Sequence, residues 1–282
     1  MIWLLAAFLL QFSAYEYLDR VVLAPEAGFT QSVAAAVGPS AGATGTYSYD
    51  KAYYSEFSLR NLKIYATKDD SLVRNISLKA NQVFTYFTWL PDRNIALAGV
   101  ATNYARSTTV TLMSIDPETN SEPVSPKVVD LARGAKITDV AFSTLTNVTN
   151  ILITNGTVAE VYRTDANNYL RRLYLGTRYI DRIATLTGRD VLLYDDSVSK
   201  AVYAYYGNGR RARISPDGRS PFALIGADKN DNIYLGQLAY GDMVSSIWEG
   251  KIDARFREVK VLDTPYPAGS ISVDYGGKIS FS

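Results

Sequence analysis

The chain of 282 residues contains no histidine and no cysteine. Without histidine it cannot form a Ser-His-Asp or Cys-His relay, and it has no imidazole to bind a metal or carry a proton. Without cysteine it has no thiolate nucleophile, zinc–thiolate site, iron–sulfur cluster or disulfide. Any chemistry therefore falls to carboxylates, lysine, tyrosine and serine, or to a cation held by oxygen atoms.

A strong excess of one charge is also missing. The formal net charge is +1, and 20% of the residues are charged, so no global field favours nucleic acid. We predict no nucleic-acid partner, and no residue set in the sequence indicates a cofactor or a bound metal. What the chain does have is 21 tyrosines and 47% hydrophobic residues. Aromatic enrichment is typical of pleated, half-buried strands, and the length suffices for one large all-β domain.

The first residues form an uncharged hydrophobic run, MIWLLAAFLLQFSAY. It extends to residue 23 only if Glu16, Asp19 and Arg20 are included. A spanning helix needs about 20 apolar residues, whereas the core of a signal peptide needs about 7–15. We expect residues 1–23 to be a hydrophobic helix that serves as a membrane anchor or signal segment. An uncleaved anchor, a cleaved signal and a buried helix all remain open.

Small residues with almost no charge dominate the next segment, and the stretch GPSAGATG begins at Gly38. Such a composition cannot pack a core and is typical of a flexible tether. We therefore divide the chain into a membrane-facing segment at 1–23, a linker at 24–54 and a globular domain at 55–282.

From residue 55 onward the hydrophobic pattern has a period of two, and a unit of four strands recurs about every 45 residues. The first strand of successive units is predicted at 83–90, 137–144, 180–187, 221–228 and 269–275. Turn-forming residues follow each of them, as in Pro91-Asp92-Arg93-Asn94, which is typical of β-hairpins.

Both ends of this region hold an incomplete unit. The last unit stops after two strands, and two unassigned strands are predicted at 57–66 and 72–78. Joined in one blade, these fragments would close a ring and cover the open sheet edges. The sequence thus predicts an all-β fold, a five-bladed β-propeller of four-stranded antiparallel blades. The alternative is a β-sandwich with similar strand spacing.

Short phrases in the repeat resemble those of known propellers. Ser215-Pro216-Asp217-Gly218-Arg219 resembles the S-P-D-G-[KR] turn of TolB-type and WD-like repeats, and the phrase from Trp89 to Leu97 is a variant of it. Lys229-Asn230-Asp231-Asn232-Ile233-Tyr234-Leu235 is similar to the D-x-x-G-N-I-Y-V phrase of NHL-type repeats, with Asp231 in place of glycine. The resemblance covers 55–282 at the level of the fold, and it implies no catalytic residue because propellers host many functions.

One mouth of the predicted channel is rich in arginine and tyrosine. The loops that enter first strands, and those that join second to third strands, supply this rim. Such residues can grip an anionic or sugar-like ligand through charge-assisted bonds and stacking. The predicted binding residues are Arg133, Lys136, Arg178, Tyr179, Arg219, Tyr104, Arg106, Tyr240 and Tyr266. The alternative is that they are ordinary solvated loop residues.

The opposite mouth carries aspartates in its hairpin turns: Asp92, Asp190, Asp228, Asp231 and Asp274. Aspartate in a turn usually bonds its own backbone, although clustered carboxylates can also bind Ca²⁺ or act as an acid–base pair. The nearest approach to such a pair is Asp139 with Asp181, near two inner-strand starts. A basic string, Arg210-Arg211-Ala212-Arg213, falls on an outer strand and is typical of a charged edge.

These features lead to three hypotheses on function. The first is a non-enzymatic, membrane-tethered propeller that acts as an extracytoplasmic binding or scaffolding module, anchored or secreted, for another protein or a glycan. The second is a carboxylate-dependent enzyme acting on glycans. The third is a structural subunit of a larger membrane complex, which an exposed apolar patch would favour.

Overall fold

The computed structural model describes residues 46–119, 125–165 and 169–282. The predicted membrane anchor or signal segment at 1–23 lies outside the described residues, as does most of the predicted linker. In the described ranges, no helix is long and apolar enough to cross a membrane.

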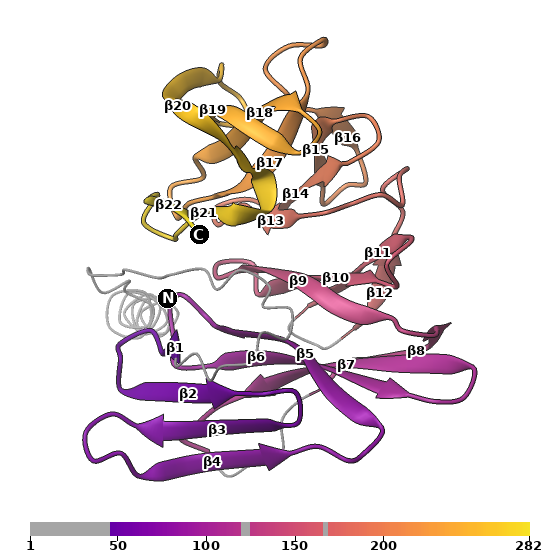
Figure 1. Ribbon diagram of the computed structural model, residues 1–282, viewed down its shortest axis with the longest axis vertical. Coiled ribbons are helices and arrows are strands. Elements are labelled where there is room, and N and C mark those ends of the chain that lie inside the picture. Colours follow the sequence, from indigo (N-terminus) through magenta and orange to yellow (C-terminus); the bar gives the residue numbers. More distant parts are fainter. Residues whose placement is uncertain (1–45, 120–124, 166–168) are drawn as a thin grey trace, which may run out of the picture.

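The described chain forms six antiparallel sheets in which consecutive strands pair (Figure 1). Sheet I contains β1 (Thr46–Tyr47), β2 (Tyr53–Phe57), β3 (Asn61–Ala66) and β4 (Leu72–Ser77). Sheet II contains β5 (Gln82–Trp89), β6 (Ala96–Asn103), β7 (Ser107–Ile115) and β8 (Lys127–Ala132). Sheet III contains β9 (Lys136–Ser143), β10 (Val148–Thr154), β11 (Ala159–Thr164) and β12 (Arg171–Leu173).

The C-terminal half repeats the arrangement. Sheet IV contains β13 (Ile183–Thr185), β14 (Val191–Asp196), β15 (Ala201–Tyr206) and β16 (Arg211–Arg213). Sheet V contains β17 (Phe222–Ala227), β18 (Ile233–Tyr240), β19 (Met243–Gly250) and β20 (Arg257–Pro267). A short 3₁₀ helix, η2 (Ala268–Ser270), leads into the two-stranded sheet VI, which contains β21 (Ile271–Val273) and β22 (Ile279–Phe281).

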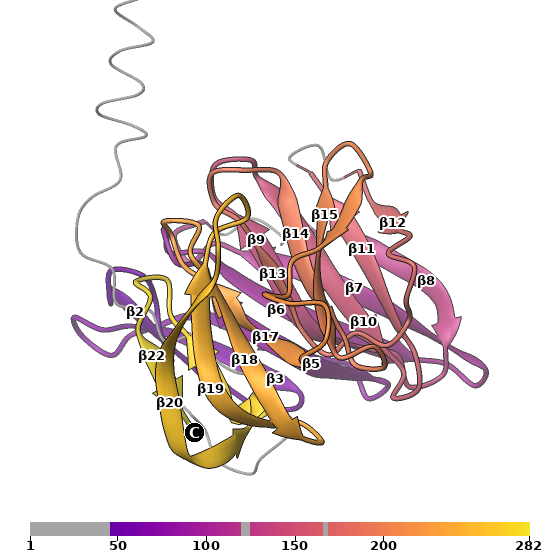
Figure 2. The same cartoon turned by 90° about the horizontal axis from the view of Figure 1, so that it is seen from above.

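The first strands of sheets II to VI follow one another around the middle of the molecule. In order, β5 contacts β9, β9 contacts β13, β13 contacts β17 and β17 contacts β21. Figure 2 shows the strands of successive sheets lying side by side across the molecule. This arrangement of sheets around a centre confirms the predicted repeat, and it differs from the two stacked layers of a sandwich.

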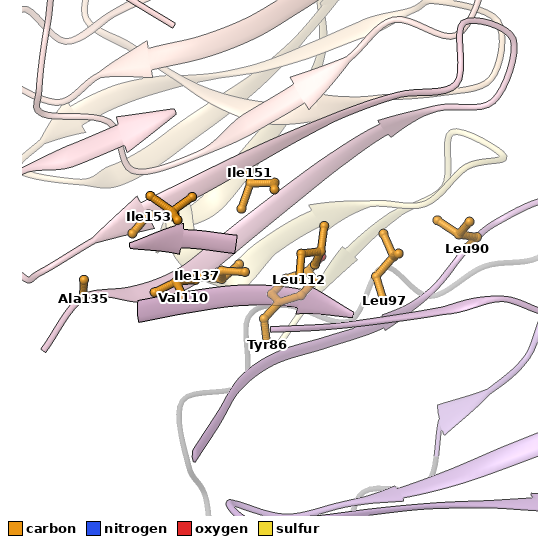
Figure 3. Packing of buried hydrophobic residues seen from close by; sticks show 10 residues of the cluster. Tyr86, Leu90, Leu97, Val110, Leu112, Ala135, Ile137, Ile151 and Ile153 are labelled. Carbon is orange, nitrogen blue, oxygen red and sulfur yellow. The ribbon is translucent and has the colours of Figure 1, made fainter. Parts of the chain in front are cut away.

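The core lies between neighbouring sheets. One buried cluster joins Tyr86, Leu97 and Leu112 of sheet II to Ile137 and Ile151 of sheet III (Figure 3). Four further clusters join sheets I to II, III to IV, IV to V and V to VI in the same way. Second strands such as β6 are buried on both faces, because each inner sheet packs against two neighbours.

The ends of the domain differ from the predicted closure. Residues 57–66 do not form one strand, since a turn at Ser58 separates β2 from β3. Sheet I is therefore complete by itself, and its β1 and the start of β2 lie within the range 24–54 expected to be a linker. Among the described residues β21 and β22 pair only with each other, so the predicted blade shared by both chain ends is not seen.

Candidate functional site

A cavity of about 420 Å³ lies at the centre, where the inner strands meet. Five sheets contribute to its wall, through Tyr86 of β5, Asp139 of β9, Ile183 of β13, Gly226 of β17 and Val273 of β21. We call this cavity the channel. It follows from the repeat, because every unit from sheet II to sheet VI places its first strand toward the same axis.

Arg182, next to the start of β13, connects three sheets at the channel wall. In β17 the pairing register shifts between Leu224 and Gly226, so the bulge at Ile225 frees backbone groups from the ladder. The Arg182 guanidinium donates to the carbonyls of Leu224 at 3.4 Å and Ile225 at 3.0 Å. It also donates to Ile271 O at 2.9 Å and Ala268 O at 3.3 Å. Much of the donor capacity of this side chain is therefore used inside the protein.

Asp139 faces the channel from β9 and holds the next sheet in place. Its Oδ2 accepts the Ile183 N–H at 3.0 Å, and its Oδ1 accepts the Val140 N–H at 2.9 Å. The side chain touches the channel space, yet protein surrounds it, and this burial raises the pKa of its carboxyl group. The hydrogen bonds and the charge of Arg182 oppose that rise without cancelling it.

Asp195, near the end of β14, binds the residues just before Ile183. One carboxylate oxygen accepts the Asp181 N–H at 3.0 Å and the Arg182 N–H at 2.9 Å. Burial raises the pKa of this carboxyl group to about 6. Asp195 lines a smaller cavity of about 220 Å³. Asp181, Arg182 and Gly269 line both this cavity and the channel, so the two cavities meet at these three residues.

The channel wall thus offers two carboxylates, one arginine and several aromatic rings. Asp139 binds backbone N–H groups, whereas Asp181 is exposed and also lines the smaller cavity. In the described ranges, no group of three or more acidic side chains is placed to hold a metal ion. Aromatic lining comes from Tyr86, Trp89, Phe142 and Tyr275. Such a wall suits a small ligand with hydrogen-bond donors and an apolar or ring face.

The predicted arginine and tyrosine rim lies apart from this wall. Its members, Arg133, Lys136, Arg178, Tyr179, Arg219, Tyr104, Arg106, Tyr240 and Tyr266, are all exposed. None of these nine lines the channel or the smaller cavity. Arg178 instead pairs with Glu160 of β11 at 3.3 Å, and the ring of Tyr266 contacts Phe281. Ligand binding by this rim stays a prediction.

Two of the five aspartates of the opposite mouth, Asp228 and Asp274, act as turn residues. Asp228 Oδ1 accepts the N–H groups of Asn230 and Asn232, both at 2.9 Å, and Asp274 accepts that of Lys278 at 2.8 Å. Asp231 instead reaches the neighbouring sheet, where it accepts the Thr187 N–H at 2.6 Å.

The two remaining aspartates of this mouth form ion pairs. Asp190 pairs with Arg163 of sheet III at 2.7 Å, and Asp92 pairs with Arg93 at 2.7 Å. The turn hypothesis therefore holds for Asp228 and Asp274, whereas Asp231 and Asp190 link neighbouring sheets and Asp92 pairs with the adjacent Arg93.

Sequence reasoning identified part of the channel site and missed its centre. It singled out Asp139 and Asp181 from their places at inner-strand starts, but it assigned no role to Arg182 or Asp195. The available signal was a charged pair, Asp181-Arg182, at the start of an otherwise apolar inner strand. The partners of Arg182 lie 42 to 89 residues away in sequence, so a local pattern cannot reveal them.

No family model and no curated protein matches the chain. Similar solved structures include dipeptidyl peptidase 4 of Porphyromonas gingivalis, with 12% identity, a TM-score of 0.55 and 82% of this chain covered. The chain spans 41% of the length of that peptidase.

Two more similar structures are virginiamycin B lyase of Staphylococcus aureus and a putative TolB of Agrobacterium tumefaciens. The lyase has 14% identity and a TM-score of 0.51, and the match covers 81% of this chain and 71% of the lyase. The TolB protein has 12% identity and a TM-score of 0.50, with 79% and 82% covered. At such identities the likeness establishes the fold alone: the chain is a β-propeller built from repeated four-stranded antiparallel sheets.

Proposed function

We propose that the protein is a membrane-tethered, non-enzymatic binding module that holds a small ligand in the channel on the extracytoplasmic side of a membrane. The observation that carries this proposal is the channel cavity of about 420 Å³, a size typical of small-molecule sites. The hydrophobic run at 1–23 and the small-residue segment after it support the tether.

The charges of the wall indicate the kind of ligand. Asp139 and Asp181 contribute two carboxylates, and Arg182 contributes one positive charge that is directed at backbone carbonyls. Asp181 is therefore the exposed carboxylate that a ligand would meet at the wall. A ligand with an ammonium group or several hydroxyl groups matches these acceptors, and its ring or apolar face matches Trp89 and Phe142.

An isosteric change at Asp181 tests this proposal. With a glucosamine oligomer as probe, we expect calorimetry on the full chain to show binding that Asp181→Asn weakens by about tenfold, the cost of one charge-assisted bond. The control is Asp263→Asn, an exposed site on β20 outside the channel. Absence of binding, or equal binding by both variants, would contradict the proposal.

The second candidate is a carboxylate-dependent enzyme acting on glycans. It is favoured by one observation, two carboxylates in one cavity of which Asp139 has a raised pKa, as a general acid requires. In that case the wild-type chain would release reducing ends from the oligomer. Asp139→Asn and Asp181→Asn would each abolish release, and intact oligomer after long incubation would speak for binding alone.

Membrane tethering makes a separate prediction. We expect the full chain to sediment with membranes after a high-salt wash, because electrostatic attachment would be screened whereas a hydrophobic anchor would not. Protease added outside intact cells should cut in the segment 24–45 and release a fragment that contains 55–282. A shortened chain in the medium would instead indicate a cleaved signal, and a soluble full-length chain would exclude the tether.

A further inference from the structure

A third concave site lies on the outer side of sheet IV, between this sheet and the segment that follows sheet III. It has a volume of about 570 Å³. One wall is the segment Leu175, Gly176 and Thr177 after β12, and the other is built from β14, β15 and β16. We call it the rim groove. None of the residues that line the channel lines the rim groove, so it constitutes a site independent of the proposed function.

Arg211 is built into the groove from its outer strand. Its guanidinium occupies the space that a Cβ at position 176 would fill, so the close approach depends on Gly176, which has a φ of +80°. Beside it, the buried Tyr194 hydroxyl donates to Leu175 O at 2.9 Å. Burial raises the pKa of Tyr194 to about 12, and the positive charge of Arg211 acts in the opposite direction. The arginine is thus held against a fixed wall.

A second arginine and a tyrosine extend the same face. Arg213 lies two residues after Arg211 on β16, and side chains at this spacing share one face of a strand about 7 Å apart. Arg213 pairs across the strands with Tyr203 of β15. The Tyr203 ring stacks on Tyr194, with centroids 5.6 Å apart and an interplanar angle of 20°. Tyr203 and both arginines line the groove.

Positive charge prevails in the rim groove. Its acidic member is Asp196, whose carboxylate accepts bonds from Val198 N at 3.0 Å and Ser199 Oγ at 2.9 Å within its own turn. Across the described ranges, no salt bridge involves Arg211 or Arg213. Each guanidinium carries five N–H donors, so both can serve an anion that enters the groove.

We propose that the rim groove binds an acidic carbohydrate, a sugar that carries a carboxylate or a sulfate. The two guanidinium groups bind the oxyanion with charge-assisted, bidentate geometry. Tyr203, backed by Tyr194, offers a rigid aromatic surface for the sugar ring. A concave site between sheet IV and the segment after β12 fits a compact ring better than a flat lipid surface, and the tyrosine platform favours a sugar over an acidic peptide.

Calorimetry on the full chain tests this with an oligogalacturonate probe. We expect binding that falls as salt rises, whereas the matching neutral galactose oligomer shows none. Arg211→Gln and Arg213→Gln should each weaken binding about tenfold or more. Tyr203→Ala should weaken it further than Tyr203→Phe, because only the first removes the ring.

Arg210→Gln is the matched control, since it removes the same charge one residue away. Arg210 stacks on the Tyr206 ring at 4.2 Å and does not line the groove. We therefore expect the Arg210→Gln variant to bind oligogalacturonate within about twofold of the wild-type affinity. Unchanged melting temperatures would show that the variants fold. The proposal is overturned if the neutral oligomer, a glutamate peptide or sodium sulfate binds as tightly as oligogalacturonate, or if Arg211→Gln and Arg213→Gln behave like Arg210→Gln.

Discussion

Replacing Arg182 with methionine is expected to lower the free energy of unfolding by about 3–5 kcal/mol, the range for breaking a buried charged network. Methionine retains much of the apolar volume but none of the donors. Four carbonyls would lose a donor, and they belong to residues of three elements: Leu224, Ile225, Ala268 and Ile271. Leu224, Ile225 and Ile271 are buried, so water cannot readily replace the lost bonds. Urea-induced unfolding at neutral pH measures the loss.

Arg189→Met is the matched control. Arg189 forms an ion pair with Asp253, in which both side chains are more than half exposed, and such surface pairs contribute about 1 kcal/mol at most. The two variants lose the same charge and the same donors. The difference between their free energies of unfolding therefore measures what the bonds from Arg182 to β17 and to the chain around sheet VI contribute. Equal losses in the two variants would show that the bonds of Arg182 to these carbonyls carry no stability.

The regular part of the fold was predictable from the sequence because its causes are local. Alternation of apolar and polar residues, ended by turn residues, placed the first strands of sheets II, III and V within one or two residues of their observed bounds. β13 is shorter than the predicted 180–187, because Asp181 and Arg182 give their N–H groups to Asp195 and not to a ladder partner.

The ends of the domain were harder because local pattern does not decide them. FSLRNLKIYA reads as one alternating run, yet Ser58 N and Oγ both bind Asn61 O and turn the chain between β2 and β3. The other two strands of sheet I are β1 (Thr46–Tyr47) and β2 (Tyr53–Phe57), and β1 and the start of β2 lie in residues that we had assigned to the tether because they follow the small-residue stretch. The pairing of β1 with β2 decided the structure here, and a flexible-linker interpretation based on composition could not foresee it.

In the candidate site, too, the features with local causes were predictable and those that depend on contacts between distant residues were not. The sequence placed Asp139 and Asp181 near one axis, because equivalent positions of a repeat converge. It could not show that Asp139 and Asp195 bind the segment 181–183 from two sides, since those bonds join different strands. Arginine and tyrosine side chains, expected at the channel mouth, also occur together in the rim groove, where Arg211 and Arg213 had been assigned only to a charged edge.

Asp195→Asn is expected to stabilise the protein at neutral pH and to change little at pH 4. Asp195 has a pKa of about 6 in the folded protein, raised first by burial, and about 3.9 when unfolded. Between these values the folded state holds a proton that the unfolded state has released, so stability falls as pH rises through this window. The loss is complete above about pH 6 and amounts to roughly 3 kcal/mol. Asparagine avoids it, because its amide oxygen can accept the same two N–H groups without a buried charge.

Comparing each variant with wild type at pH 4, 5, 6 and 7 isolates this effect, because other raised groups such as Asp139 cancel in the difference. Asp217→Asn is expected to have the opposite effect on stability. Backbone N–H groups of Ser220 and Arg219 lower the pKa of Asp217, so its ionised form stabilises the fold. This stabilisation is present from pH 7 down to about pH 4 and is lost only as the pH falls further through the lowered pKa, so Asp217→Asn should destabilise the protein at all four pH values. The opposite result would be that Asp195→Asn destabilises the protein at pH 7, as Asp217→Asn does. It would mean that the two N–H bonds to the Asp195 carboxylate stabilise the fold by more than the burial of its charge costs.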